Sequence, residues 1–230
     1  MEFWQEFGPR ATATDAWTAT YEAPMPDGGA LTLPLRDMGE TAVAGFIANQ
    51  AAFSVARQLA DWMTDIARPF GAEVVVGLPT LGQVFAPLVA EALGHPNWVA
   101  PGWSRKRWYE ERLSVAAHSI TSPAERRLWL DPRLLPRLAG RRVVMVDDVV
   151  STGASAQAGL ALLAAADVRP VSVLVAMAQG NRWVADWPGD VPLRAVFATP
   201  IFRRTEAGWV PIADTAPHHL CPLTPKDLAA

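Results

Sequence analysis

The sequence predicts an α/β fold in which a parallel sheet is flanked by helices. Residues 72–103 and residues 141–178 each run from a short apolar strand through a glycine-containing turn into an apolar helix, and then return to a strand. The strand segments lack a polar residue at every second position, which is typical of strands buried on both faces of a parallel sheet. A third observation is the strand-like composition near both ends of the chain, which predicts a smaller addition to this core.

The first elements of the chain form a predicted hairpin. Residues 18–24 and 30–36 have strand composition, and Pro26–Gly29 between them contains the aspartate and glycines that tolerate a tight reversal. The next segment, residues 41–63, is predicted to be a long amphipathic helix. Its apolar residues recur at roughly helical spacing at Val43, Phe46, Ile47, Phe53, Leu59 and Trp62.

Two strand-turn-helix-strand units follow. In the first, we predict strands at 72–79 and 97–103 around a helix at 81–94. In the second, strands at 141–148 and 170–178 flank a helix within 151–166. Alternating strands and helices of this kind build a parallel sheet.

The polar segment after the first unit and the C-terminal part of the chain complete the predicted division into three regions. Residues 104–127 are too long and too polar for a simple connector, so we predict a mobile functional loop. Residues 195–202 predict a strand, and residues 208–212 end a hairpin. We therefore divide the chain into an N-terminal hairpin and helix (1–66), an α/β core (67–180) and a C-terminal strand and loop segment (181–230).

Composition excludes several classes of protein. Twenty basic and 23 acidic residues among 230 give a net charge of −3, so no large electrostatic footprint for nucleic acid is expected. A single cysteine, Cys221, excludes an intrachain disulfide. Glu2 and Glu6 stand where a secretory signal would be basic, and we find no apolar run of membrane-spanning length. We expect a cytoplasmic protein that does not bind a membrane.

The segment Val143–Ser155, VVMVDDVVSTGAS, carries the clearest chemistry. A buried strand ends in two carboxylates, and a turn of small residues leads into a helix. The carboxyl end of a parallel strand is where ligands bind, and the backbone N–H groups of such a turn favour a phosphate. Gly153 permits close approach of an anion to the backbone. Asp147 and Asp148 would repel a phosphate, so they are expected to face sugar hydroxyls or a bridging Mg²⁺.

This segment closely resembles the phosphoribosyl pyrophosphate (PRPP) motif of type I phosphoribosyltransferases. The resemblance implies that Asp147 and Asp148 contact the ribose hydroxyls. It also implies that a six-residue turn cradles the 5′-phosphate, namely Val150, Ser151, Thr152, Gly153, Ala154 and Ser155. The alternative interpretation is that the two aspartates only cap a turn.

A second segment, Gly77–Gln83, resembles the pyrophosphate loop of the same family. It follows a buried strand and opens a helix, and its amides would bind the leaving pyrophosphate. The residues assigned to that role are Pro79, Thr80, Leu81 and Gly82, with Arg105 from the next loop. By itself such a segment would indicate only a turn.

The third segment begins at Ser104 and resembles the start of the basic loop that closes over PRPP in orotate and xanthine enzymes. We assign Lys106 or Arg107 as the closing cation, with a catalytic role, although such a run is often only a solvated face. The orotate signature is absent beyond Arg107, which favours a purine acceptor, as in adenine-like and xanthine-like enzymes. Trp103, Trp108 and Trp183 are candidates for stacking on the base.

The resemblance implies a transferase that moves ribose 5-phosphate from PRPP to a nucleobase and releases pyrophosphate. It implies Mg²⁺ carried by the substrate, with Asp147 as a candidate ligand, a hood over the acceptor built from both ends of the chain, and a homodimer. Two alternatives stay open: a PRPP-sensing regulatory protein without catalysis, and an unrelated sugar- or nucleotide-binding α/β protein.

Overall fold

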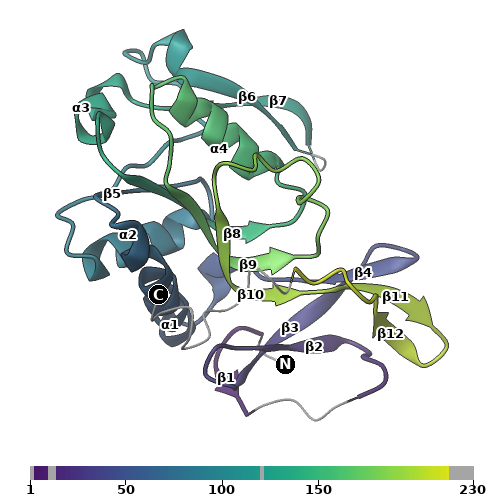
Figure 1. Ribbon diagram of the computed structural model, residues 1–230. Helices are drawn as coiled ribbons and strands as arrows, with labels where there is room; N and C mark the ends of the chain where they lie inside the picture. The colour runs from purple at the N-terminus through teal and green to yellow at the C-terminus, as the bar shows by residue number, and fades with distance from the viewer. Residues whose placement is uncertain (1–2, 10–13, 120–121, 218–230) are drawn as a thin grey trace.

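The computed structural model describes residues 3–9, 14–119 and 122–217. A parallel sheet with helices on both faces forms the larger part, and a small antiparallel sheet lies beside its β10 edge (Figure 1). The predicted fold class is therefore confirmed. Cys221 lies outside the described residues. Within them, no helix is both long enough and apolar enough to cross a membrane.

The parallel sheet has four strands in the order β10-β9-β8-β5. Their bounds are β5 (Val74–Gly77), β8 (Val143–Val150), β9 (Ser172–Gln179) and β10 (Leu193–Thr199). Neighbouring strands pair in parallel throughout, so the buried, β-branched segments form the predicted sheet. The carboxyl ends of β5 and β8 therefore lie at the same edge.

Helices cover both faces of this sheet. Helices α1 (Phe53–Ala67) and α2 (Gly82–Ala92) pack together on one face, and α4 (Ala154–Ala164) lies on the other (Figure 1). Successive strand residues alternate between the two cores: Val144 joins the α1 and α2 side, and Met145 joins the α4 side. Both cores exclude water, which accounts for the continuous apolar character of β8.

Short helical turns connect these elements. They are α3 (Leu135–Leu138) and the 3₁₀ turns η1 (Ala48–Gln50), η2 (Arg68–Phe70), η3 (Glu111–Leu113) and η4 (Pro132–Leu134).

The small sheet draws strands from both ends of the chain. It contains β1 (Phe7–Gly8), β2 (Thr20–Pro24), β3 (Ala30–Asp37), β4 (Thr41–Ala44), β11 (Ile201–Thr205) and β12 (Gly208–Pro211). The β2–β3 hairpin reverses at Pro26–Gly29 as predicted, and β11 pairs with β4 to join the C-terminal segment to the N-terminal one. This sheet is the hood that the sequence predicts.

The prediction of a helix at 41–63 is wrong over its first half. Residues 41–44 form β4, and the helix starts at Phe53. Among the apolar residues before Phe53, Phe46 is buried and Val43 and Ile47 are partly buried, because strand β4 and the loop after it pack on the core. Their spacing therefore reflects tertiary burial and no helical face. Helix α1 also packs on β9 and β10, so it covers the parallel sheet although it falls within the region 1–66 that was assigned to the hood.

The segment predicted as a loop at 104–127 contains regular structure. Strands β6 (Ser114–Ser119) and β7 (Ser122–Trp129) form an antiparallel hairpin that packs on α4. Residues 120 and 121 lie outside the described part. The predicted strand at 97–103 is reduced to single bridges, which join Val99 to Val76 and Gly102 to Trp129.

Candidate functional site

A cavity of about 480 Å³ lies at the carboxyl ends of β5 and β8. The loop before α2, the end of β8, the start of α4 and the β6–β7 hairpin all contribute to its wall. The lining residues are Pro79, Thr80, Leu81, Trp103, Ala117, Arg126, Asp147, Asp148, Val149 and Ser155. The structure thus brings together two segments that the sequence separates by about 70 residues, the turn at 79–81 and the aspartate pair.

Two helices begin beside this cavity. Helix α2 starts at Gly82 and α4 starts at Ala154, and neither first turn is capped by a side chain in the described part of the chain. The first backbone N–H groups of an α-helix have no partner within the helix, and they carry partial positive charge. The edge of the cavity therefore has two sets of donors suited to an anion.

Two glycines permit this geometry. Gly153 precedes α4 with φ +84°, a left-handed conformation that side chains disfavour. A Cβ at Gly82 would lie 2.7 Å from the Asp147 Cα and 2.9 Å from its Oδ1, so only glycine fits there. Helix α2 consequently starts in direct contact with the end of β8.

The two aspartates are held in an environment that disfavours their charge. Asp147 is 5% exposed, and its Oδ1 accepts a hydrogen bond of 2.9 Å from the backbone N–H of Asp148. Burial, followed by repulsion from Asp148, raises the pKa of Asp147 well above its ordinary value. Burial also raises the pKa of Asp148 to about 6. A ligand that supplies hydroxyl donors or a cation would relieve this cost.

The predicted basic residues lie outside the cavity. Arg105 forms an ion pair of 3.0 Å with Glu111, and its guanidinium lies 5.2 Å from the ring centre of Trp129. Neither Lys106 nor Arg107 lines the wall, and the cation that does so is Arg126 of β7. The sequence places Arg126 in a polar stretch with no motif, so only the hairpin geometry reveals it.

The hydroxyl of Ser151 is engaged within the protein. It donates a hydrogen bond of 2.7 Å to Gln179 Oε1 and accepts one of 2.6 Å from Arg182 Nη2. Its proton therefore points to Gln179, so in this arrangement the Ser151 hydroxyl offers a ligand only lone pairs. Gln179 is the last residue of β9 and Arg182 lies in the loop after it, and no sequence motif marks either position.

The three candidate tryptophans have different environments. Trp103 lines the cavity beside the aspartates. Trp108 is exposed and donates a hydrogen bond of 3.0 Å to Asp131 Oδ2. Trp183 is 2% exposed and donates to the carbonyl of Gly180, so it belongs to the core and cannot stack on a ligand.

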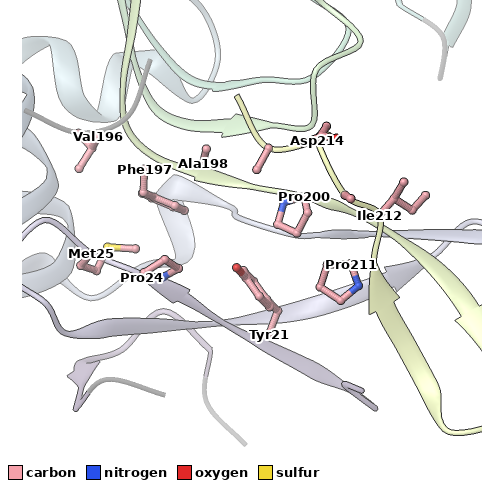
Figure 2. Close-up of a pocket in the computed structure, with 12 residues that line it drawn as sticks. Tyr21, Pro24, Met25, Val196, Phe197, Ala198, Pro200, Pro211, Ile212 and Asp214 are labelled. Carbon is pink, nitrogen blue, oxygen red and sulfur yellow. The ribbon is translucent and has the colours of Figure 1, made fainter. Parts of the chain in front are cut away.

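A second cavity, of about 390 Å³, lies between the small sheet and β10. Tyr21 rises from β2 toward Phe197 and Pro200, and Pro211 and Ile212 close one side (Figure 2). Its wall is mostly apolar and shares no residue with the cavity at Asp147.

Protein side chains alone do not build a metal site here. Within the described residues, no group of three histidine, cysteine, aspartate or glutamate side chains has the spacing for a metal ion. Asp147 and Asp148 nevertheless offer the oxygen ligands that Mg²⁺ prefers, and Mg²⁺ is usually completed by substrate phosphates and water. The pair therefore fits a cation that arrives with a substrate.

Solved structures share this fold. The adenine phosphoribosyltransferase of Thermoanaerobacter pseudethanolicus matches with a TM-score of 0.54 at 16% identity, over 64% of this chain and 81% of that one. The adenine phosphoribosyltransferase of Saccharomyces cerevisiae, solved with an iminoaltritol bisphosphate and adenine, matches with a TM-score of 0.54 at 17% identity, over 78% of this chain and 94% of that one. At these identities the likeness establishes the fold alone.

Sequence relatives and a family model give a closer comparison. A hypoxanthine/guanine phosphoribosyltransferase of Methanosphaerula palustris is 34% identical over 125 residues, which cover 51% of this chain and 66% of that protein. An adenine phosphoribosyltransferase of Frankia alni is 28% identical over 141 residues, 59% of this chain and 67% of that protein. The chain thus spans about two thirds of the length of these relatives. The phosphoribosyl transferase domain model matches residues 46–194, which contain both helix-start turns and the aspartate pair, so the chain belongs to the phosphoribosyl transferase family.

Proposed function

We propose that this protein transfers the ribose 5-phosphate group of PRPP to a nucleobase and releases pyrophosphate. The observation that carries the proposal is the cavity where the buried Asp147 and the partly buried Asp148 lie beside the starts of α2 and α4. A sugar that bears a phosphate at one end and a pyrophosphate at the other matches this pattern of hydroxyl acceptors and separate anion sites.

In this proposal each part of PRPP has its own segment. The ribose hydroxyls donate to Asp147 and Asp148, which relieves part of the cost of their burial. The turn 150–155 takes the 5′-phosphate through its backbone N–H groups. The turn 79–82 takes the pyrophosphate at the start of α2.

The transfer exchanges one bond for another. A ring nitrogen of the base bonds to C1 of the ribose, and the bond from C1 to the pyrophosphate oxygen breaks with its electron pair leaving on that oxygen. The proton of the nitrogen passes to the released pyrophosphate or to water. Catalysis then depends on stabilising the negative charge that develops on the leaving pyrophosphate. Hydrogen-bond donors that are already fixed in place stabilise this charge without having to rearrange. We assign this role to the backbone N–H groups of residues 80–82, since Pro79 has none, and to Arg126, which lines the same cavity. Mg²⁺ bound to the substrate would supply further positive charge.

The acceptor is proposed to be a purine. Both sequence relatives are named for purine bases, and Trp103 offers an aromatic face in the cavity beside Asp148. The acceptor must reach C1 of the sugar, so we place it at Trp103 and not in the apolar cavity of Figure 2, which receives no residue from the 79–82 or 147–155 segments.

The test is a panel of nucleobases offered with PRPP and Mg²⁺, with pyrophosphate release as the readout. We expect release with a purine and none without a base. Turnover should be lost in an Asp147→Asn, Asp148→Asn variant whose thermal unfolding midpoint is no lower than that of the wild type. Binding of PRPP without release for any base would instead identify the regulatory alternative, and absence of PRPP binding would overturn the proposal.

The assembly and location are proposed from the family resemblance. We propose a homodimer in the cytoplasm, where PRPP and nucleobases are available and a lone cysteine stays reduced. Light scattering of the purified protein would measure the mass directly, and a monomer at enzyme-assay concentrations would contradict the dimer.

A further inference from the structure

The loop that follows β9 packs over the turn between β8 and α4. Arg182 Nη2 lies 2.6 Å from Ser151 Oγ, and Gln157 Nε2 donates a hydrogen bond of 3.1 Å to the carbonyl of Asp186. Gly153 faces Trp183 so closely that a Cβ at the glycine would lie 3.2 Å from the tryptophan Cβ. These contacts hold the loop after β9 against the turn between β8 and α4.

The side chains of this turn provide no positive charge for a phosphate, so a cation must come from another segment. The turn 149–155 contains no basic side chain, and Asp147 and Asp148 precede it directly. Backbone N–H groups and the start of α4 supply only partial positive charge. Arg182 is the only basic residue between β9 and Pro188, so it is the formal cation that this loop brings to the turn.

The hydrogen bonds of Ser151 and Arg182 decide which of their donors remain available to an anion. Gln179 Nε2 donates a hydrogen bond of 2.7 Å to the carbonyl of Ala44 in β4, which turns its Oε1 toward Ser151. Ser151 gives its proton to that Oε1, so toward an anion it has only lone pairs to offer. The guanidinium, with five N–H donors, keeps further donors after the one bond to Ser151.

We propose that Arg182 binds the 5′-phosphate of the sugar phosphate, and that Ser151 and Gln179 position its guanidinium. The inference rests on the proposed function, because it assigns one residue of the same site. A guanidinium forms two parallel hydrogen bonds with a phosphate, so Arg182 supplies both charge and direction at the 5′ end.

Calorimetric titration with ribose 5-phosphate and, separately, with pyrophosphate tests this assignment. We expect Arg182→Gln to weaken ribose 5-phosphate binding about tenfold or more, the effect of losing one charged hydrogen bond, and to leave pyrophosphate binding unchanged. Arg182→Lys should recover part of the loss. Arg57→Gln, an exposed arginine on α1, is the matched control and should bind both ligands as the wild type does.

The outcomes separate this inference from the proposed function. If the wild type binds ribose 5-phosphate and Arg182→Gln binds it equally well, Arg182 has no such role while the function stands. The same holds if the variant loses affinity for both ligands by one common factor, which would indicate a structural effect. A wild type that binds neither ribose 5-phosphate nor PRPP overturns the function and this inference together.

Discussion

Gly82 and Asp147 are in contact through main-chain and carboxylate atoms, and a single added carbon at Gly82 would lie 2.7 Å from the Asp147 Cα. The first turn of α2 and the end of β8 are therefore in direct contact, although 64 residues lie between Gly82 and Asp147 in the sequence. This contact joins the proposed pyrophosphate turn to the proposed ribose site.

Substituting Gly82→Ala should force these two segments apart. We expect the free energy of unfolding to fall by about 1–3 kcal/mol, the usual cost of overpacking, and the affinity for PRPP to fall as well. Urea denaturation and calorimetry measure the two effects. Gly189→Ala is the control, because a Cβ there meets no atom within 4 Å; equal stability of the two variants would contradict the argument.

The raised pKa of Asp148 predicts a pH-dependent stability. The folded protein holds this proton more tightly than the unfolded chain, so the contribution to stability is full at low pH and is lost as the pH rises through about 6. Asp148→Asn removes the charge, and at pH 7.5 we expect it to raise the free energy of unfolding by about 1–2 kcal/mol. The gain should shrink toward pH 4.

Denaturant unfolding across that pH range measures the effect. Asp61→Asn, on the exposed surface of α1, serves as the control and should show no comparable gain. A constant difference between Asp148→Asn and wild type from pH 4 to 7.5 would show that the charge of Asp148 is not the cause.

Substitution of Arg126 and substitution of Lys106 with Arg107 are expected to have different effects on activity. If Arg126 is the cation of the cavity, Arg126→Gln should lower kcat/KM for PRPP by about tenfold to hundredfold. The double variant Lys106→Ala, Arg107→Ala should then stay close to wild type, because neither residue lines the cavity. Steady-state kinetics compare them directly. The reverse order of effects would restore Lys106 or Arg107 as the closing cation.

Trp103 is predicted to contact the base. Trp103→Leu should raise KM for the purine about three- to tenfold, the value of an aromatic contact, and leave KM for PRPP near its wild-type value. Trp108→Leu is the matched control, since Trp108 is exposed and bonded to Asp131. An equal rise in both variants would argue against a base contact at Trp103.

The sequence predicts the parallel sheet well because its signal is local. Strands β5 and β8 and the helices after them appear as uninterrupted apolar runs and glycine turns, and the structure has each of them in place. By contrast, Val43 and Phe46 suggest a helix only because both are apolar. Their packing depends on Ile201 in β11 and Phe197 in β10, which are 158 and 151 residues away in the sequence. Long-range burial of this kind leaves no periodic trace.

The sequence predicts those parts of the candidate site that belong to recognisable motifs. Asp147, Asp148 and the turn at 79–81 meet in one cavity, as the adjacency of parallel strand ends requires. Arg126, which lines the cavity, and Arg182, which contacts Ser151, could not be predicted, because each belongs to a neighbouring segment whose position is set by the packing of a hairpin or a loop on α4. Sequence spacing alone favoured the more conspicuous run at Arg105.

The side chain of Gln179 touches two parts of the protein that are 135 residues and 28 residues away in the chain, Ala44 in the hood and Ser151 in the phosphate turn. One amide thus joins a strand of the hood to the turn where the sugar phosphate is proposed to bind. By the reciprocity of linked equilibria, a ligand that displaced β4 and thereby altered affinity for the sugar phosphate would have its own affinity altered by the sugar phosphate by the same factor.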